Sequence, residues 1–96
     1  MKLTNILQDE KLTLSFEVFP PKSDADFESV KDAAYRVAAL QPGYMSVTYG
    51  AGGSTAGNTL AIAEGIQKTY DVPTIAHLTC VGATRESIRR SLTDMK

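Results

Sequence analysis

The sequence predicts an α/β protein in which three consecutive strand–helix units share one parallel sheet. Short apolar runs of strand length alternate with longer stretches in which apolar residues recur at helical spacing. Each apolar run also carries a polar residue, and these residues, Glu17, Thr48 and His77, follow one another at intervals of about 30 residues, roughly the length of one strand–helix unit. Strands that alternate with helices pair in parallel, with right-handed crossovers.

The first unit follows a polar stretch, residues 1–12, which we expect to form a short helix or an ordered arm. Residues 13–19 alternate between apolar and polar side chains and so predict a strand, with Phe16 and Val18 on one face and Glu17 on the other. Two prolines follow and end the strand, because proline has no backbone N–H to donate.

The helix of the first unit begins after these prolines. Ser23 or Asp24 can cap it, since short polar side chains accept hydrogen bonds from the free amides of a first turn. Apolar residues then recur at helical spacing to about Leu40. The Gln-Pro-Gly sequence of residues 41–43 predicts the stop and the turn.

The second and third units repeat this pattern. Residues 44–49 predict a strand, residues 50–55 a glycine-rich loop, and a helix then runs to about Tyr70. Residues 74–80 predict the third strand, and Thr84 caps the last helix.

Length and composition limit the class of protein. The chain has 96 residues, 43% of them hydrophobic, and a formal net charge of −1, which suits at most one soluble domain and predicts neither nucleic-acid nor membrane binding. The N-terminal segment lacks the apolar core of a signal peptide, so we expect a cytoplasmic protein. The lone Cys80 excludes an intrachain disulfide, and we expect it to pack against the helices. No metal site is expected, because no second His or Cys stands at ligand spacing.

The strand faces favour a (β/α)8 barrel over a doubly wound sheet. Each predicted strand has one apolar face and one face of mixed polarity, whereas strands covered by helices on both faces are uniformly apolar. A complete barrel needs about 250 residues. We therefore expect residues 1–96 to be the N-terminal part of a single catalytic barrel domain, three of its eight units. Two open sheet edges would remain, and these favour a homo-oligomer.

Glu17 is the main candidate for chemistry. Its functional interpretation is a general acid or base in a partly dry pocket; the alternative is a carboxylate neutralised by an Arg or Lys from another part of the fold. His77, the only histidine, suits either ligand contact or a core hydrogen bond. Thr48 can donate inward or serve simply as a strand former. Residues 50–55 can cradle phosphate with their amides or form an ordinary loop.

Three stretches of the sequence resemble methylenetetrahydrofolate reductases. They are residues 15–22, SFEVFPPK, residues 46–54, SVTYGAGGS, and residues 77–81, HLTCV. Their order and spacing agree with the first three strands of that family, so the resemblance covers most of the chain. The start at residue 1 is similar to the short bacterial form, of which this chain would be an N-terminal fragment.

The resemblance implies a flavin-dependent barrel enzyme. In that family NAD(P)H reduces bound FAD, which passes hydride to 5,10-methylenetetrahydrofolate and gives 5-methyltetrahydrofolate for methionine synthesis. The family's acid matches Glu17 and is expected to protonate the folate and open its five-membered ring. The residues that contact the cofactors match Thr48, Tyr49, Ala51 and His77.

Two other functions remain open on the residues alone. Because the fourth strand and later residues of the family lie beyond residue 96, we expect the chain by itself to bind FAD weakly and to be inactive. A non-catalytic phosphate-binding or self-assembling βα module would retain the same scaffold and glycine-rich loop. An unrelated barrel enzyme acting on a sugar phosphate is less favoured, because no Lys or Arg stands near that loop.

Overall fold

The computed structural model describes residues 2–8, 11–21, 24–49 and 56–96. Three strands alternate with helices along these residues: β1 (Ser15–Val18), β2 (Tyr44–Val47) and β3 (Thr74–Ala76). The helices are α1 (Leu3–Leu7), α2 (Phe27–Ala38) after the 3-10 turn η1 (Asp24–Asp26), α3 (Ala56–Tyr70) and α4 (Arg85–Asp94). The predicted glycine-rich loop, residues 50–55, lies outside the described residues.

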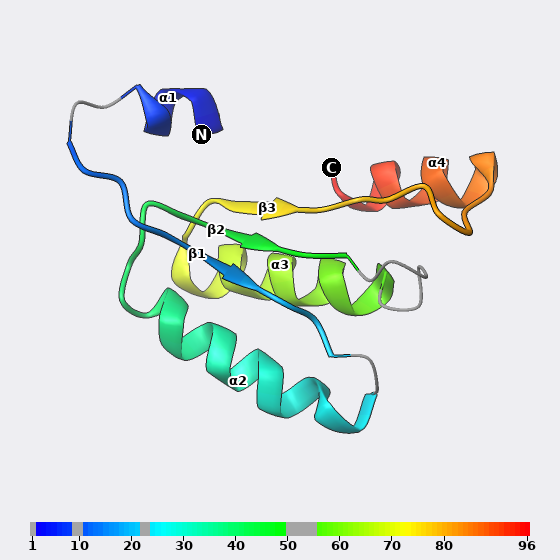
Figure 1. The fold of residues 1–96 in the computed structure, drawn as a ribbon, viewed down its shortest axis with the longest axis horizontal. Coiled ribbons are helices and arrows are strands. Elements are labelled where there is room, and N and C mark those ends of the chain that lie inside the picture. The colour runs from blue at the N-terminus through cyan, green and yellow to red at the C-terminus, as the bar shows by residue number, and fades with distance from the viewer. Residues whose placement is uncertain (1, 9–10, 22–23, 50–55) are drawn as a thin grey trace.

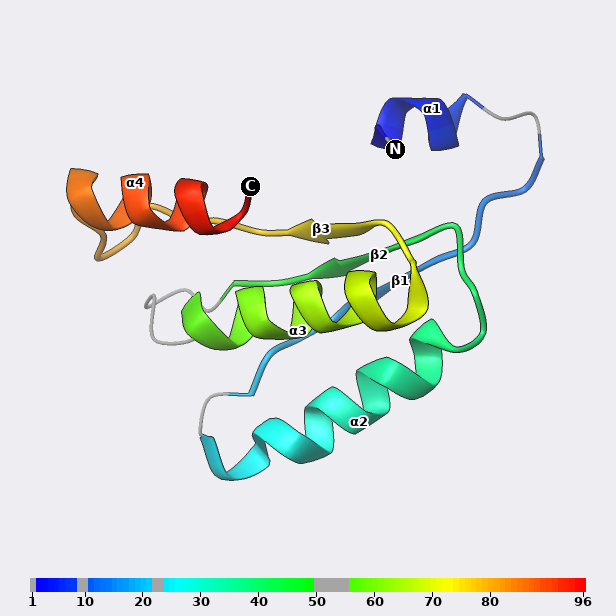
Figure 2. The same cartoon turned by 180° about the vertical axis from the view of Figure 1, so that it is seen from behind.

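The strands form one parallel sheet in the order β1-β2-β3. Helices α2 and α3 lie side by side on the same side of this sheet (Figures 1 and 2). The predicted α/β class, with a parallel sheet alternating with helices, is therefore confirmed. Because parallel strands all point the same way, their carboxyl ends meet at one edge, where the chain leaves β1, β2 and β3 in turn (Figure 1).

The hydrophobic core lies between the sheet and these two helices. Phe16 and Val18 of β1 pack against it, as the alternation of the strand predicted. Each helix contributes the residues that recur at helical spacing, which confirms the predicted apolar faces. The fully or nearly fully buried residues of the core are Ala34, Ala38, Met45, Val47, Ile62, Ala63, Ile66 and Val72.

The strands are shorter than the sequence predicted, because each needs a paired neighbour. We predicted strands over residues 13–19, 44–49 and 74–80; regular pairing covers only the residues given above. Single hydrogen bonds extend the ladder a little: the amide of Thr48 donates to the carbonyl of Val18 at 2.9 Å, and the amide of His77 to that of Val47 at 3.0 Å. Alternating side chains predict a strand-like backbone, whereas its paired length depends on the partner strand.

The helix boundaries combine correct and wrong predictions. The α-helix α2 begins at Phe27, after a 3-10 turn, and so starts later than the predicted cap at Asp24; Ser23 lies outside the described residues. The helix ends before the turn predicted at residues 41–43, and Gln41 in that turn has a left-handed backbone, at φ 56°. Thr84 caps α4 through a reciprocal pair of hydrogen bonds with Ser87, which confirms that prediction.

The last helix and the cysteine differ from expectation. None of the residues of α4, all of them described, is buried, and the side chain of Leu92 is exposed. Cys80 is exposed as well, so our prediction that it packs against the helices was wrong. The strand β3 ends at Ala76, and therefore strand alternation no longer fixes which way Cys80 points.

Candidate functional site

Three side chains, from β1, from β2 and from the residue directly after β3, meet on the sheet face opposite α2 and α3. The hydroxyl of Ser46 donates a hydrogen bond to Oε1 of Glu17 at 2.9 Å. The imidazole Nε2 of His77 lies 3.6 Å from the same oxygen. Because side chains alternate between the faces of a strand, Glu17 and Ser46 point away from their neighbours Phe16 and Met45, which face the core.

The heights of these residues differ from our prediction in one respect. We expected Glu17, Thr48 and His77 at about the same level of the sheet. The register instead pairs Glu17 with Ser46, and Ser46 with Ile75. Thr48 and His77 lie two residues further towards the carboxyl edge than Ser46 and Ile75, as the hydrogen bonds after β1 and β2 show. The long imidazole of His77 still reaches back to the carboxylate.

Burial distinguishes the three residues. The side chains of Glu17 and His77 are 48% and 42% exposed, whereas Ser46 is only 9% exposed. The partly dry pocket that we expected around the carboxylate is therefore not formed by the described residues. A half-exposed contact of this kind contributes little to stability.

Sequence reasoning missed a hydrogen bond that holds the end of β2 at this edge. The hydroxyl of Thr59, a fully buried residue of α3, donates to the backbone carbonyl of Thr48 at 2.8 Å. This bond joins the first turns of α3 to the end of β2 and brackets the glycine-rich segment between them. Thr59 occupies a helix position that periodicity alone assigns to packing, and no signal in the sequence identified its partner.

Two further predicted residues, Thr48 and Tyr49, lie at the same edge. Thr48 and Tyr49 directly follow β2 and are half-buried, and Ala51 lies outside the described residues. Thr79, two residues after His77, has a buried hydroxyl without a hydrogen-bond partner among the described groups. Buried hydroxyls without a partner are uncommon.

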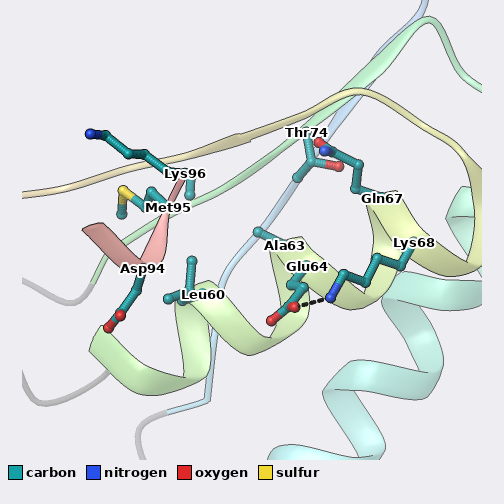
Figure 3. Close-up of a pocket in the computed structure, with 10 residues that line it drawn as sticks. Leu60, Ala63, Glu64, Gln67, Lys68, Thr74, Asp94, Met95 and Lys96 are labelled. Atoms are coloured by element: carbon teal, nitrogen blue, oxygen red, sulfur yellow. Dashed lines mark hydrogen bonds and ion pairs between the residues drawn. The ribbon is translucent and has the colours of Figure 1, made fainter. Parts of the chain in front are cut away.

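A separate cavity opens on the other face of β3. Its volume is about 360 Å³, and it lies between α3, β3 and the residues Asp94–Lys96 (Figure 3). Ala76, which lines it, points to the opposite face from His77. Four charged residues line the cavity; Glu64 and Lys68 pair with each other along α3, as the dashed line shows in Figure 3, and Asp94 and Lys96 come from the end of the chain described here. We therefore place the candidate site at Glu17 and not in this cavity.

The described residues contain neither a metal-binding cluster nor a helix that could span a membrane. No group of three or more His, Cys, Asp or Glu side chains within the described ranges is arranged to hold a metal ion. Likewise, none of the helices in the described part of the chain combines the length and the apolar character that crossing a membrane requires.

The fold and the site define a class of protein: a parallel α/β protein whose polar side chains gather at the carboxyl edge of the sheet, where this architecture carries its active sites. Comparison with known sequences identifies the family. The sequence model of the methylenetetrahydrofolate reductases matches residues 2–96. The chain belongs to the methylenetetrahydrofolate reductase family.

Individual relatives agree with this assignment. The chain is 38% identical over 95 residues to a probable methylenetetrahydrofolate reductase (NADH) of Oryza sativa subsp. japonica, covering 99% of the chain and 16% of that relative. It is 33% identical over 79 residues to the 5,10-methylenetetrahydrofolate reductase of Salmonella typhimurium, covering 82% of the chain and 27% of the relative. The chain thus spans about one sixth of the plant relative and about a quarter of the bacterial one.

Proposed function

We propose that the protein carrying this chain reduces 5,10-methylenetetrahydrofolate to 5-methyltetrahydrofolate with NAD(P)H, through bound FAD. The observation that carries the proposal is the carboxylate of Glu17, held by Ser46 and faced by His77 at the carboxyl edge of the sheet, in a chain of this family. The names of the relatives state the reduced substrate, and those of the plant relatives also state NADH.

We further propose that residues 1–96 are the first three units of a (β/α)8 barrel domain. The parallel order β1-β2-β3 supports this, as do the helix-facing apolar residues of β1 and β2 and the polar residues Glu17 and Ser46 on their opposite face. In a barrel the polar face would point to the interior, and the carboxyl edge would line the active site. The chain covers 16% of the plant relative and 27% of the bacterial one, so most of each relative lies outside the matched region.

The residues at this edge suit a flavin. Thr48, Tyr49 and His77, with Ala51, would hold it. Hydroxyl and imidazole groups beside main-chain amides match the polar edge of such a cofactor. FAD, when bound, supplies the hydride chemistry, and the side chains of this chain supply orientation and a proton.

In this proposal Glu17 donates a proton to a nitrogen of the folate substrate. Opening the five-membered ring breaks a C–N bond, and the departing nitrogen must take up a proton. A carboxylic acid can deliver it if the site excludes water around the acid. Because Glu17 is half exposed among the described residues, we propose that the rest of the barrel and the bound ligands enclose it.

The test separates the two half-reactions in the full-length protein. Glu17→Gln should abolish the reduction of methylenetetrahydrofolate by the reduced flavin, while NADH still reduces the flavin. Glu64→Gln is a matched control, because Glu64 is 54% exposed and lies on α3, away from the site; it should leave both half-reactions unchanged. Loss of both half-reactions in Glu17→Gln would contradict the proton-donor role.

Residues 1–96 alone are proposed to lack this activity, since they provide only one wall of the site. A yellow flavin spectrum together with NADH oxidation by the purified 96-residue chain would overturn this statement.

The second candidate function, a self-assembling module, is favoured by one observation: within the described residues, β1 and β3 each have one unpaired edge. Such edges favour pairing with a second copy of the chain.

A further inference from the structure

Ser46 is the only polar residue of β2 whose side chain is almost fully buried. It lies between Met45 and Val47, both of them completely buried on the helix side. A hydroxyl removed from water costs free energy unless it forms a hydrogen bond. The bond that it forms, 2.9 Å long, goes to the half-exposed carboxylate of Glu17.

We propose that Ser46 is a positioning residue for the proton donor Glu17, a role that rests on the function proposed above. Both contacts of the carboxylate described here, from Ser46 and from His77, go to Oε1. Oε1 is thereby directed into the sheet, and Oε2 is the oxygen left to carry the proton towards the substrate. A buried serine on a paired strand holds this orientation more firmly than a loop residue, because its backbone is fixed by the ladder.

The same hydrogen bond also favours the transfer itself. Before transfer, Glu17 is neutral, with its proton on Oε2, and Oε1 accepts from a neutral hydroxyl. When the proton moves to the substrate nitrogen, the O–H bond breaks, an N–H bond forms, and the carboxyl becomes an anion. Hydrogen bonds to an ionised acceptor are roughly twice as strong as neutral ones. The bond from Ser46 therefore strengthens as the reaction proceeds, and such interactions accelerate a step.

The register explains why this serine, and not Thr48, holds the acid. Ser46 is directly opposite Glu17 across the β1–β2 ladder, and side chains of directly opposite residues are close enough to touch. Thr48 lies two residues further along β2 on the same face, and it would be opposite Phe19 if the register continued. A hydroxyl at position 46 is thus the group that strand pairing brings to the carboxylate.

The experiment compares Ser46→Ala with Ser46→Thr in the full-length holoenzyme. Ser46→Ala should slow folate reduction by the reduced flavin about tenfold, the effect expected from losing one hydrogen bond to a charged group, and should leave flavin reduction by NADH unchanged. Ser46→Thr, which keeps the hydroxyl, should restore most of the rate. In a Glu17→Gln background, Ser46→Ala should cause no further loss, because the serine acts through the acid.

Two results would overturn the role of Ser46. One is an equal loss in both half-reactions, which a merely structural residue would produce. The other is a full additional loss in the Glu17→Gln background. If the wild-type protein shows no folate reduction at all, the proposed function fails by itself. The carboxyl ¹³C resonance of Glu17 then decides: Ser46→Ala should shift it and Ser46→Thr should not, and an unmoved resonance in Ser46→Ala refutes the positioning.

Discussion

The hydroxyl of Thr59 donates a hydrogen bond of 2.8 Å to the backbone carbonyl of Thr48, and Thr59 is fully buried. This contact joins helix α3 to the end of strand β2 and fixes where the chain leaves the sheet. Thr48 is one of the residues proposed to contact the cofactors. The geometry of the site therefore depends on a helix residue that itself touches neither cofactor nor substrate in the proposal.

Thr59→Val removes this hydrogen bond while preserving the shape of the side chain. It should lower the free energy of unfolding by about 1–3 kcal/mol, because the carbonyl of Thr48 loses a buried partner. Urea denaturation of the purified protein measures the change. Thr93→Val is the matched control: its hydroxyl bonds to the carbonyl of Arg89 on the exposed surface of α4, so the change should stay within about 0.5 kcal/mol. Equal effects of the two substitutions would argue against the anchor.

Gly65 in α3 allows the ring of Tyr35 to lie against the helix backbone. A Cβ added there would clash with the hydroxyl oxygen of Tyr35, whose ring also packs edge-on against Tyr70 at 5.4 Å. Gly65→Ala should therefore destabilise the protein by roughly 1–3 kcal/mol, as judged by thermal unfolding. In a Tyr35→Ala background the same change should become stabilising, by up to about 1 kcal/mol.

A second glycine of the same helix serves as the control for that experiment. A Cβ at Gly57 would meet nothing within 4 Å, so Gly57→Ala should be neutral or slightly stabilising. If Gly65→Ala also proved stabilising in the wild-type background, the close contact between Tyr35 and the helix would be wrong.

Thr84→Ala should loosen α4 with little effect on the rest of the fold. The helix has no buried residue, so its order depends on the capping box that Thr84 forms with Ser87. Loss of such a cap costs about 0.5–2 kcal/mol locally. Amide hydrogen exchange should accelerate across α4 and remain unchanged in α2 and α3. Exchange that accelerates equally in all three helices would show that α4 and the core unfold together.

The open edge of β1 should support self-association of the 96-residue chain. Sedimentation velocity at increasing concentration should show dimers or larger species, and Ser15→Lys should reduce them, because a lysine on an edge strand opposes pairing. Ser15 is exposed on β1. Ser29→Lys on the exposed surface of α2 introduces the same charge away from the edge and should have no effect. A monomer at all concentrations would reject association through the edges.

The sequence predicted the arrangement of the elements better than their contacts. Alternation in residues 13–19 correctly assigned Phe16 to the core and Glu17 to the polar face, because that assignment depends only on parity. The register could not be predicted in this way, since it depends on which residue of β2 faces β1. For that reason we placed Thr48 beside Glu17, whereas Ser46 occupies that position.

At the candidate site, the sequence predicted that Glu17 and His77 lie close together but did not predict the exposure of the carboxylate. Glu17 and His77 were expected to lie together, and their side chains are 3.6 Å apart. The dry pocket was not found among the described residues, because enclosure of a carboxylate depends on groups that short strands do not bring with them. The roles of Glu17, Thr48, Tyr49, Ala51 and His77 remain predictions.

The register of β1 also determines which face of the sheet carries the carboxylate of Glu17. A slip of β1 by one residue would turn Glu17 towards Met45 and the helices and expose Phe16 and Val18, since one step reverses every side chain of a strand. A buried, unpaired carboxylate makes that arrangement strongly unfavourable. A register shift is therefore disfavoured, and the same apolar residues that stabilise the sheet also keep the carboxylate of Glu17 on the accessible face.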